Sequence, residues 1–297
     1  MTAARRTPSP ANDAPIQRSD AGFLRWGKRA LGLNAALALF FLYAPILVLV
    51  VFSFNDSKLA ARWEGFTLRW YGSLLQNESI LHATRNSLVV ALISTAAATV
   101  IGTMTALAME RFRFRGRRLY DGLLYLPIIN PEIITGVSLL AFFSLTLGAI
   151  NNAFNLSGDS ALRTGLVTVT LTHIAFNIAF VAVVVRTTLK NFPRSLEEAA
   201  QDLGANEWVT FRRVTLPLIA PGILAGALLA FTLSLDNFVI TFFVTGPGGA
   251  TLPIEVFGLI RRAISPEINA VSTIMLAISI ALIVGSQIIL RKRGDNL

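Results

Sequence analysis

Long runs of apolar residues dominate this chain, and short polar stretches separate them. Four of these runs contain no charged side chain: residues 31–54, 86–109, 164–185 and 268–290. Two more each carry one acid in their interior, at about 121–148 (Glu132) and 216–244 (Asp236). A helix of about 20 residues crosses a hydrocarbon core of about 30 Å, because it rises about 1.5 Å per residue. The pattern therefore predicts six transmembrane helices.

Composition supports a membrane protein and excludes other ways of spanning a bilayer. The chain has 297 residues, of which 54% are hydrophobic, and its mean hydropathy is positive. Lone strands cannot span lipid because their backbone groups would have no hydrogen-bond partners. Barrel strands are shorter than these runs and alternate in polarity. We therefore predict an all-α integral membrane protein with one membrane domain, residues 31–290.

The distribution of basic residues predicts the topology. A net charge of +9 could suggest nucleic-acid binding, but an even number of spans places both termini on one side. That side holds 19 of the 26 Lys and Arg residues, in segments 1–30, 110–120, 186–213 and 291–297. The other side holds 7. The positive-inside rule therefore predicts that both termini are cytoplasmic.

The two ends of the chain differ from the membrane domain. Residues 1–30 begin with about 22 polar, proline-containing positions, so we expect a disordered cytoplasmic tail. The first apolar run is too long for a typical signal-peptide core, so we expect it to remain as a helix. Residues 291–297 form a short basic tail, also expected in the cytoplasm. The chain has no cysteine, which excludes disulfides and thiol chemistry.

A polar, helix-like segment, residues 194–217, lies between two apolar runs. Ser195 suits an N-cap, and Glu197 and Glu198 would follow in the first turn. A narrow apolar stripe recurs at helical spacing, in Leu196, Ala199, Ala200 and Leu203. Gly204 is typical of a helix stop. One interpretation is a helix resting on the lipid surface, but two alanines and a leucine favour close packing into a groove on another protein.

This segment carries a resemblance to a known family. Glu198-Ala199-Ala200, then Gly204, then Val214 and Leu216-Pro217 resemble the cytoplasmic loop of ABC-importer permeases, with Val where that pattern has Ile. The resemblance extends over about residues 31–290. It implies a coupling helix that seats in the cleft of a separate ATPase subunit, with contacts from Glu198, Ala199, Ala200, Gly204, Leu216 and Pro217. It also implies a second, non-identical permease and an external solute-binding protein as partners.

A narrower resemblance is to the permeases of spermidine/putrescine-type importers. It rests on three stretches, which are residues 126–132, residues 234–240, and Thr251-Leu252-Pro253 with residues 265–270. That group often has a second acid where this chain has Asn237. Opine, amino-sugar and other organic-cation importers use closely similar permeases, so they remain alternatives to a polyamine substrate.

Two acids inside the apolar runs are candidates for the substrate pathway. A carboxylate at a helix centre costs roughly 2.5–3.5 kcal/mol on insertion scales, so such residues face a bundle interior or a wet cavity. We expect Asp236, Glu132 and the neighbouring Asn237 to line a path for an organic cation. Structural hydrogen bonding, or pairing with an arginine near a helix end, is the alternative. For His173, which has Asn177 four residues further along the same helix, we expect a buried, hydrogen-bonded histidine, and a pore-lining role is the alternative.

Other classes of function have less support. The sequence has no Walker-type phosphate loop and no metal-site spacing, so we expect no cofactor in this chain, with ATP and magnesium bound by the partner ATPase. No nucleophile and base can be paired, which argues against an enzyme. A self-sufficient secondary transporter would need coupling-ion sites and usually an internal repeat. Neither is visible, and such a transporter would leave segment 194–217 unexplained.

Overall fold

Helices make up almost all of the described structure. The computed structural model describes residues 19–57, 62–262 and 266–294. These ranges contain twelve α-helices, a 3₁₀ turn and a π-helical turn, with one isolated β-bridge between Asn55 and Phe66. The predicted tails 1–30 and 291–297 fall partly outside: residues 1–18 and 295–297 are not described, and residues 19–30 belong to the first helix rather than to a tail.

The element bounds agree with six apolar runs. In chain order the helices are α1 (Ser19–Phe52), α2 (Arg69–Leu74), α3 (Glu78–Arg111), α4 (Arg117–Ile129), α5 (Glu132–Ala153), α6 (Leu166–Lys190), α7 (Ser195–Asp202), α8 (Glu207–Thr210), α9 (Leu216–Asp236), α10 (Val239–Val244), α11 (Leu252–Arg262) and α12 (Pro266–Gly294). The 3₁₀ turn is η1 (Gly158–Ser160), and the π-helical turn is η2 (Phe211–Thr215). Among the described residues, six helices are long and apolar enough to cross a membrane: α1, α3, α5, α6, the continuous α8–η2–α9 and α12.

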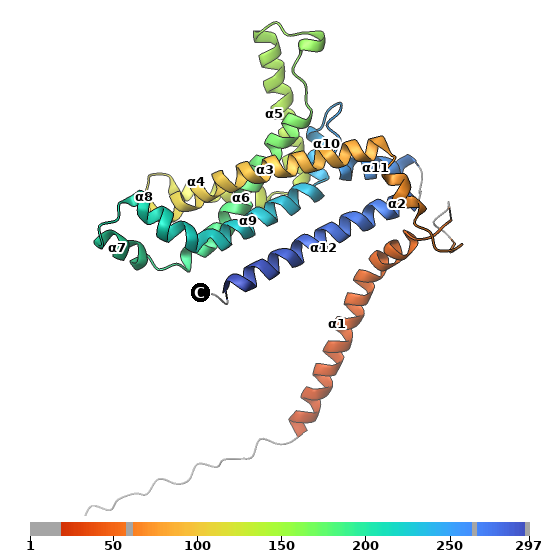
Figure 1. Ribbon diagram of the computed structural model, residues 1–297, viewed down its shortest axis with the longest axis horizontal. Coiled ribbons are helices and arrows are strands. Elements are labelled where there is room, and N and C mark those ends of the chain that lie inside the picture. Colours follow the sequence, from red (N-terminus) through yellow and green to blue (C-terminus); the bar gives the residue numbers. More distant parts are fainter. Residues whose placement is uncertain (1–18, 58–61, 263–265, 295–297) are drawn as a thin grey trace, which may run out of the picture. The chain divides into compact units, whose positions relative to one another are not determined.

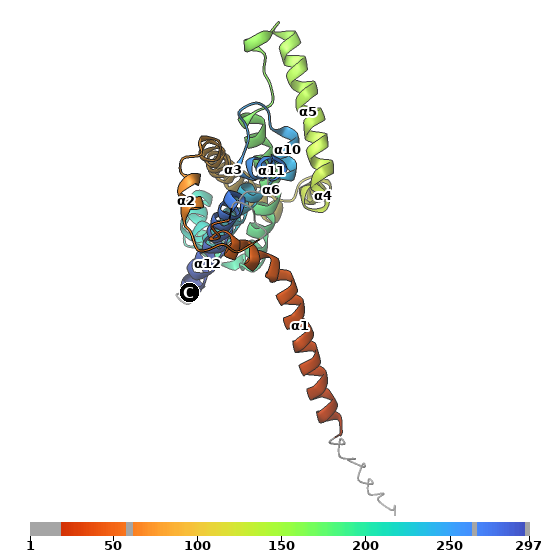
Figure 2. The ribbon, with the colours of Figure 1, turned by 90° about the vertical axis from the view of Figure 1, so that its right-hand side faces the viewer.

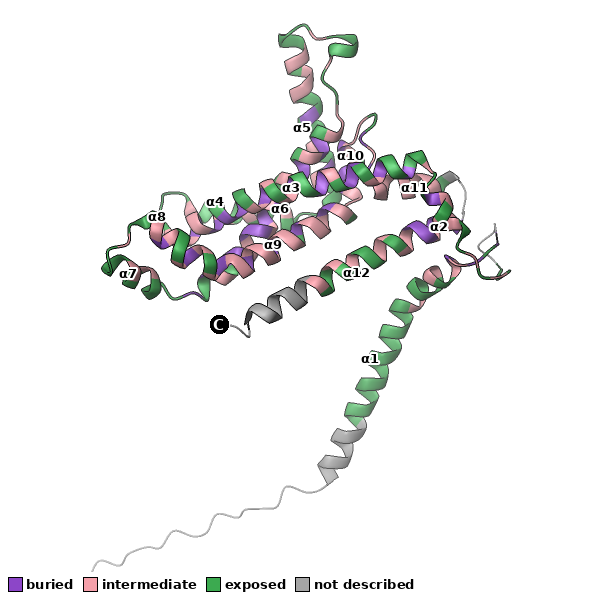
Figure 3. Ribbon diagram, in the orientation of Figure 1, coloured by how far each residue is buried: buried purple, intermediate pink, exposed green. Residues whose placement is uncertain are grey.

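The chain divides into two compact units, residues 1–51 and 52–297. The first contains most of α1, whose described side chains are largely exposed, including Phe40 and Phe41 at 68% and 84% (Figure 3). An apolar helix exposed on all sides is suited to lipid or to another apolar surface.

Three helices, α3, α6 and α9, form the core of the second unit (Figures 1 and 2). Small residues bring their backbones together around Val181 of α6. A Cβ added to Gly102 of α3 would lie 2.8 Å from the Val181 Cβ, and one added to Gly226 of α9 would lie 3.3 Å from its Cγ1. Alanines 98, 106 and 230 are fully buried in the same cluster. Helices in lipid associate through such close packing, because burial of apolar surface gives no advantage there.

Two of the predicted runs are broken in the structure. The run 121–148, predicted as one span, is divided into α4 and α5 at Asn130-Pro131. Proline lacks an amide hydrogen and disfavours a helical conformation in the residue before it, so Asn130 is extended with ψ of 138°. The run 216–244 is divided at Asn237-Phe238 into α9 and α10. α5 packs on α10 and extends away from the α3–α6–α9 core in both views (Figures 1 and 2).

A cluster of charges joins three helices near α7, at what we call the α7 end of the core. The guanidinium of Arg186 on α6 donates to the carboxylates of Glu110 on α3 and Asp121 on α4. Only 10% of the Arg186 side chain and 15% of the Glu110 side chain are exposed. The hydrogen bond from Arg186 lowers the pKa of Asp121 below its ordinary value of 3.8. Asp121 therefore remains charged at neutral pH.

The opposite end of the core, the α11 end, is held by amide and hydroxyl groups. The side-chain amide of Asn86 on α3 donates to the carbonyls of Gly248 and Ala250, at 3.0 and 2.9 Å. The hydroxyl of Ser87 accepts from the amide of Leu252 at 2.8 Å. These contacts fasten the loop before α11 to α3. The Gly-Pro-Gly-Gly run in this loop forms a turn, closed by a 3.0 Å hydrogen bond from the Gly249 amide to the Gly246 carbonyl.

The six helices and the charge distribution generate a topology prediction. Reporter fusions after residues 115, 205 and 294 should report the cytoplasm, and fusions after 65, 157 and 249 should report the outer side, because basic residues are retained on the cytoplasmic side. Paired phosphatase and fluorescent-protein fusions would measure this. One inverted pair would refute the six-span topology.

The Arg186 cluster generates a stability prediction. Arg186→Met leaves the largely buried Glu110 with only Arg117, at 4.0 Å. Removing one partner of a buried ion pair costs about 3–5 kcal/mol, so the thermal unfolding midpoint in detergent should fall clearly. Arg118→Met, at an exposed position of the same region, is the control and should leave the midpoint unchanged. Equal midpoints for both variants would contradict a stabilising role for the cluster.

Candidate functional site

The predicted coupling segment forms helix α7 and the turn that follows it. Glu197 and Glu198 lie in the first turn of α7, as predicted. The N-cap prediction was wrong by one residue, because Arg194 occupies that position without a side-chain capping bond and Ser195 is already helical. The Arg194 side chain lies 3.8 Å from the Glu198 carboxylate instead, and the two acids next to the helix N-terminus favour its dipole without a capping hydroxyl.

Gly204 ends α7 in the way that its sequence position predicted. Its φ is +90°, a left-handed conformation that glycine adopts without steric cost. The Gly204 amide donates to the Gln201 carbonyl at 2.8 Å, and the Ala205 amide donates to the Ala200 carbonyl at 3.0 Å. These two bonds form a Schellman motif. A Cβ at Gly204 would meet nothing within 4 Å, so glycine is required here by backbone conformation and not by space within this chain.

The apolar stripe of α7 has no cover within the described residues. Leu203 is 90% exposed and Leu196 is 45% exposed, and Glu198 and Ala199 are exposed beside them, while Ala200 is half-buried. Exposed apolar groups on a short, well-defined helix are typical of a surface that packs against a partner protein.

The return into the apolar run contains the π-helical turn η2, which includes Val214. It is followed by Leu216 and Pro217 in the first turn of α9. Helices α8, η2 and α9 are continuous, so Pro217 is preceded by helix and is not at a free N-terminus. Because proline cannot donate to a carbonyl four residues back, the wider π-turn accommodates it. The sequence predicted a helix start here and missed the preceding helical turns.

Glu197, which sequence reasoning placed only in the first turn, faces this chain's own helices. Its carboxylate oxygen Oε1 lies 3.0 Å from Nη2 of Arg111, the last residue of α3. The same oxygen accepts from the hydroxyl of Thr215 at 2.7 Å. The Arg111 guanidinium also lies over the ring of Phe192, 5.4 Å from its centroid. No local pattern indicates these contacts, because Arg111 and Thr215 come from helices remote in sequence.

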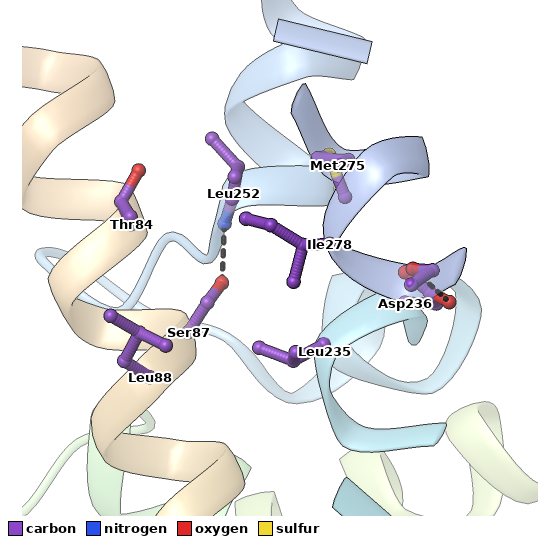
Figure 4. Close-up of a pocket in the computed structure, with 9 residues that line it drawn as sticks. Thr84, Ser87, Leu88, Leu235, Asp236, Leu252, Met275 and Ile278 are labelled. Atoms are coloured by element: carbon purple, nitrogen blue, oxygen red, sulfur yellow. Dashed lines mark hydrogen bonds between the residues drawn. The ribbon is translucent and has the colours of Figure 1, made fainter. Parts of the chain in front are cut away.

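Asp236, the stronger candidate for the substrate pathway, is the last residue of α9. It is exposed in the isolated chain, and one of its oxygens lies 3.5 Å from the Ser279 hydroxyl on α12. It borders a cavity of about 60 Å³ lined by α3, α9, α11 and α12 (Figure 4). No Lys or Arg side chain of the described residues lies within 4.0 Å of it. An acid at a helix C-terminus is opposed by the helix dipole, so this position is not explained by helix stability.

Two polar residues near Asp236 in the sequence make separate contacts. Ser234, two residues before Asp236, is buried on another side of α9, since residues two apart on a helix do not share a face. Its hydroxyl lies 2.9 Å from that of Ser94 and accepts from the Asn177 amide at 2.8 Å. Asn237 lies in the break after α9, where its side-chain oxygen accepts from the Thr241 amide at 3.3 Å.

His173 is buried and hydrogen-bonded, as predicted, and so is Asn177. The His173 Nε2 lies 2.8 Å from the Thr241 hydroxyl, and the two residues are 3% and 1% exposed. With Ser94 and Ser234 they join α3, α6, α9 and α10 through polar side chains. This arrangement holds the break after Asp236 in place.

The position of Glu132 inside an apolar run suggested that it lies at a helix centre, but the structure places it elsewhere. It is the first residue of α5, directly after Pro131, and it is exposed. At a helix N-terminus its charge is favoured by the dipole. The described residues place no Lys or Arg side chain within 4.0 Å of it, so the alternative of pairing with an arginine is not realised.

Comparison with known proteins agrees with these features. Residues 98–292 match the family described as binding-protein-dependent transport system inner membrane component. The spermidine/putrescine transport system permease protein PotC of Escherichia coli K12 is 40% identical over 85% of this chain and 90% of its own length. The putrescine transport system permease protein PotI of the same strain is 46% identical over 80% of this chain and 82% of its own length.

Solved structures share the fold. A chain of a bacterial ABC transporter for alginate has a TM-score of 0.74 at 19% identity, covering 93% of this chain and 99% of its own. A second structure shows an alginate ABC transporter in complex with a periplasmic protein that carries an alginate pentasaccharide. Its TM-score to this chain is 0.73. The family match spans most of the chain, and the two relatives match over 90% and 82% of their own lengths. The chain therefore belongs to the binding-protein-dependent transport system inner membrane components, as a transport subunit and not an enzyme.

Proposed function

We propose that this chain is one of two non-identical permeases of an ATP-driven importer that moves a polyamine, putrescine or spermidine, into the cell. The polyamine substrate is inferred from the sequence identity of 46% to PotI and 40% to PotC. These relatives are named as putrescine and spermidine/putrescine permeases. The 19% identity to the alginate transporters supports only the fold.

The site that supports a cationic substrate is the C-terminal end of α9. The carboxylate of Asp236 and the carbonyls of the last turn of α9 lie there, at the break before α10, and those carbonyls have no partner within their own helix. Both attract a cation, and helix ends at broken membrane helices coordinate cations in other transporters. Asp236 is the charged contact in this proposal. Asn237 borders the same break, and Glu132 at the start of α5 is a second contact on the path.

Helix α7 is the site that supports transport driven by a separate ATPase subunit. Its exposed apolar stripe would seat in a separate ATPase subunit, which binds ATP and magnesium, with Glu198, Ala199, Ala200 and Gly204 at the contact and Leu216-Pro217 returning the chain to the membrane. A dimer of that ATPase and an external binding protein complete the assembly. Movement of α7 on ATP binding would switch the pore between its two open states.

Coupling through α7 is tested at Gly204. Gly204→Val should abolish uptake while the protein still inserts, because a β-branched residue at φ +90° costs roughly 1–2 kcal/mol and reorients the turn. Gly204→Asp should also abolish uptake, because it adds a charge at the contact. Gly204→Asn is the control for backbone strain, since asparagine tolerates this conformation, and should retain more ATPase binding than Gly204→Val. ATPase co-purification and uptake are the measurements; normal uptake by Gly204→Val would exclude coupling at this turn.

The substrate path is tested at Asp236. Asp236→Asn keeps the shape and removes the charge, so it should slow uptake of labelled putrescine by vesicles carrying the full complex, without loss of assembly. Asp159→Asn, at an exposed acid in η1, is the control and should transport normally. Unchanged kinetics in Asp236→Asn would remove this residue from the path. Uptake confined to neutral or anionic solutes would refute a polyamine substrate.

A further inference from the structure

One carboxylate, that of Glu197, links α7 to two other elements of the chain. In addition to the backbone, Glu197 holds α7 to the end of α3 through Arg111 and to the end of η2, directly before α9, through Thr215. We call these three residues the α3–α7 anchor. The Arg111 and Glu197 side chains are only 16% and 14% exposed, so water screens the pair less than it screens a surface pair.

Local helix electrostatics favour the anchor on both sides. Arg111 is in the last turn of α3, where the helix dipole favours a cation, and Glu197 is in the first turn of α7, where it favours an anion. Glu198, the next residue, is 65% exposed, and its ion-pair partner among the described residues is Arg194 at the N-cap of the same helix. The two adjacent acids therefore point to different roles: Glu198 faces outward, and Glu197 faces the helix bundle.

Helix α3 connects the anchor to the far end of the core. It is one continuous helix of 34 residues, and it packs along both α6 and α9. At its other end Asn86 and Ser87 hold the loop before α11, and Ser87 lines the cavity beside Asp236 (Figure 4). A displacement applied at Arg111 thus reaches the α11 end through a single rigid element.

We propose that the Arg111–Glu197 ion pair, supported by Thr215, makes α7 and α3 move as one body, so that a movement of α7 is delivered to α3 and to the loop before α11. Arg111 and Glu197 are positioning residues for transport in this proposal, which rests on the proposed function. Without the pair, α7 could follow the ATPase while α3 stays behind. ATP hydrolysis would then continue without transport.

The test uses the full complex in vesicles and measures ATP hydrolysis and uptake on the same sample. Arg111→Gln and Glu197→Gln should each lower the uptake per ATP hydrolysed by about tenfold, within the range of typical coupling between sites, with hydrolysis retained. Arg113→Gln is the matched control, because Arg113 is exposed two residues further along the same segment, and should keep the wild-type ratio. A wild-type ratio in both anchor variants would overturn the proposal.

A covalent replacement separates transmission from folding. The chain contains no cysteine, so Arg111→Cys with Glu197→Cys introduces the only two thiols of this subunit, in a complex whose partners have been made cysteine-free. The double variant should be uncoupled, and a short bifunctional thiol reagent should restore uptake per ATP. If the cross-link leaves the ratio low, the two helices must separate during the cycle and the proposal fails. Loss of the assembled complex in all three variants would assign the pair to folding and also overturn it.

The outcome is independent of the substrate. If the wild-type complex transports a solute other than a polyamine, the substrate proposal fails, and the same ratio is measured with that solute. If the wild-type complex shows no ATP-driven uptake of any solute delivered by its binding protein, the proposed function itself fails. The anchor proposal is refuted only by variants that remain coupled, that are not rescued by the cross-link, or that do not assemble.

Discussion

Close approach of the α3, α6 and α9 backbones is the constraint on which the rest of the structure depends. Gly102 and Gly226 contact Val181 from two sides, and a side chain at Gly102 would overlap it. Helices in lipid gain no free energy from burying apolar surface against each other, so packing contacts and interhelical hydrogen bonds must hold them. Small residues allow both, because they bring the backbones near enough for short polar side chains to reach across.

Those short polar side chains are what the close packing makes possible. The hydroxyls of Ser94 and Ser234 meet at 2.9 Å only because α3 and α9 are adjacent, and Asn177 completes the contact from α6. The same packing brings Arg186 between Glu110 and Asp121 at the α7 end. A buried charge without a partner is costly, so the Arg186 contacts stabilise the bundle. The charged and the uncharged contacts together fix the rotation of the helices.

The surfaces that remain exposed are suited to the contacts that a transport subunit makes. The apolar stripe of α7 ends in Leu203, which is 90% exposed. Asp236 is exposed at the break between α9 and α10, and much of α5 has no cover either (Figure 3). A family of binding-protein-dependent membrane components works in assemblies, and exposed apolar or charged groups at fixed points of a rigid core suit contacts with other subunits, lipid or solute.

The sequence by itself determined the features that depend on local chemistry. Six charge-poor runs determined the membrane helices, because length and hydropathy decide insertion. Gly204 determined the end of α7, because few residues other than glycine adopt its conformation easily. The tertiary structure alone decided which face of each helix is turned inward. It placed Ser234 away from Asp236, turned Glu197 towards Arg111 and Thr215, and left Glu132 at an exposed helix start, because contacts between residues far apart in sequence depend on how helices rotate and pack, which no local pattern records.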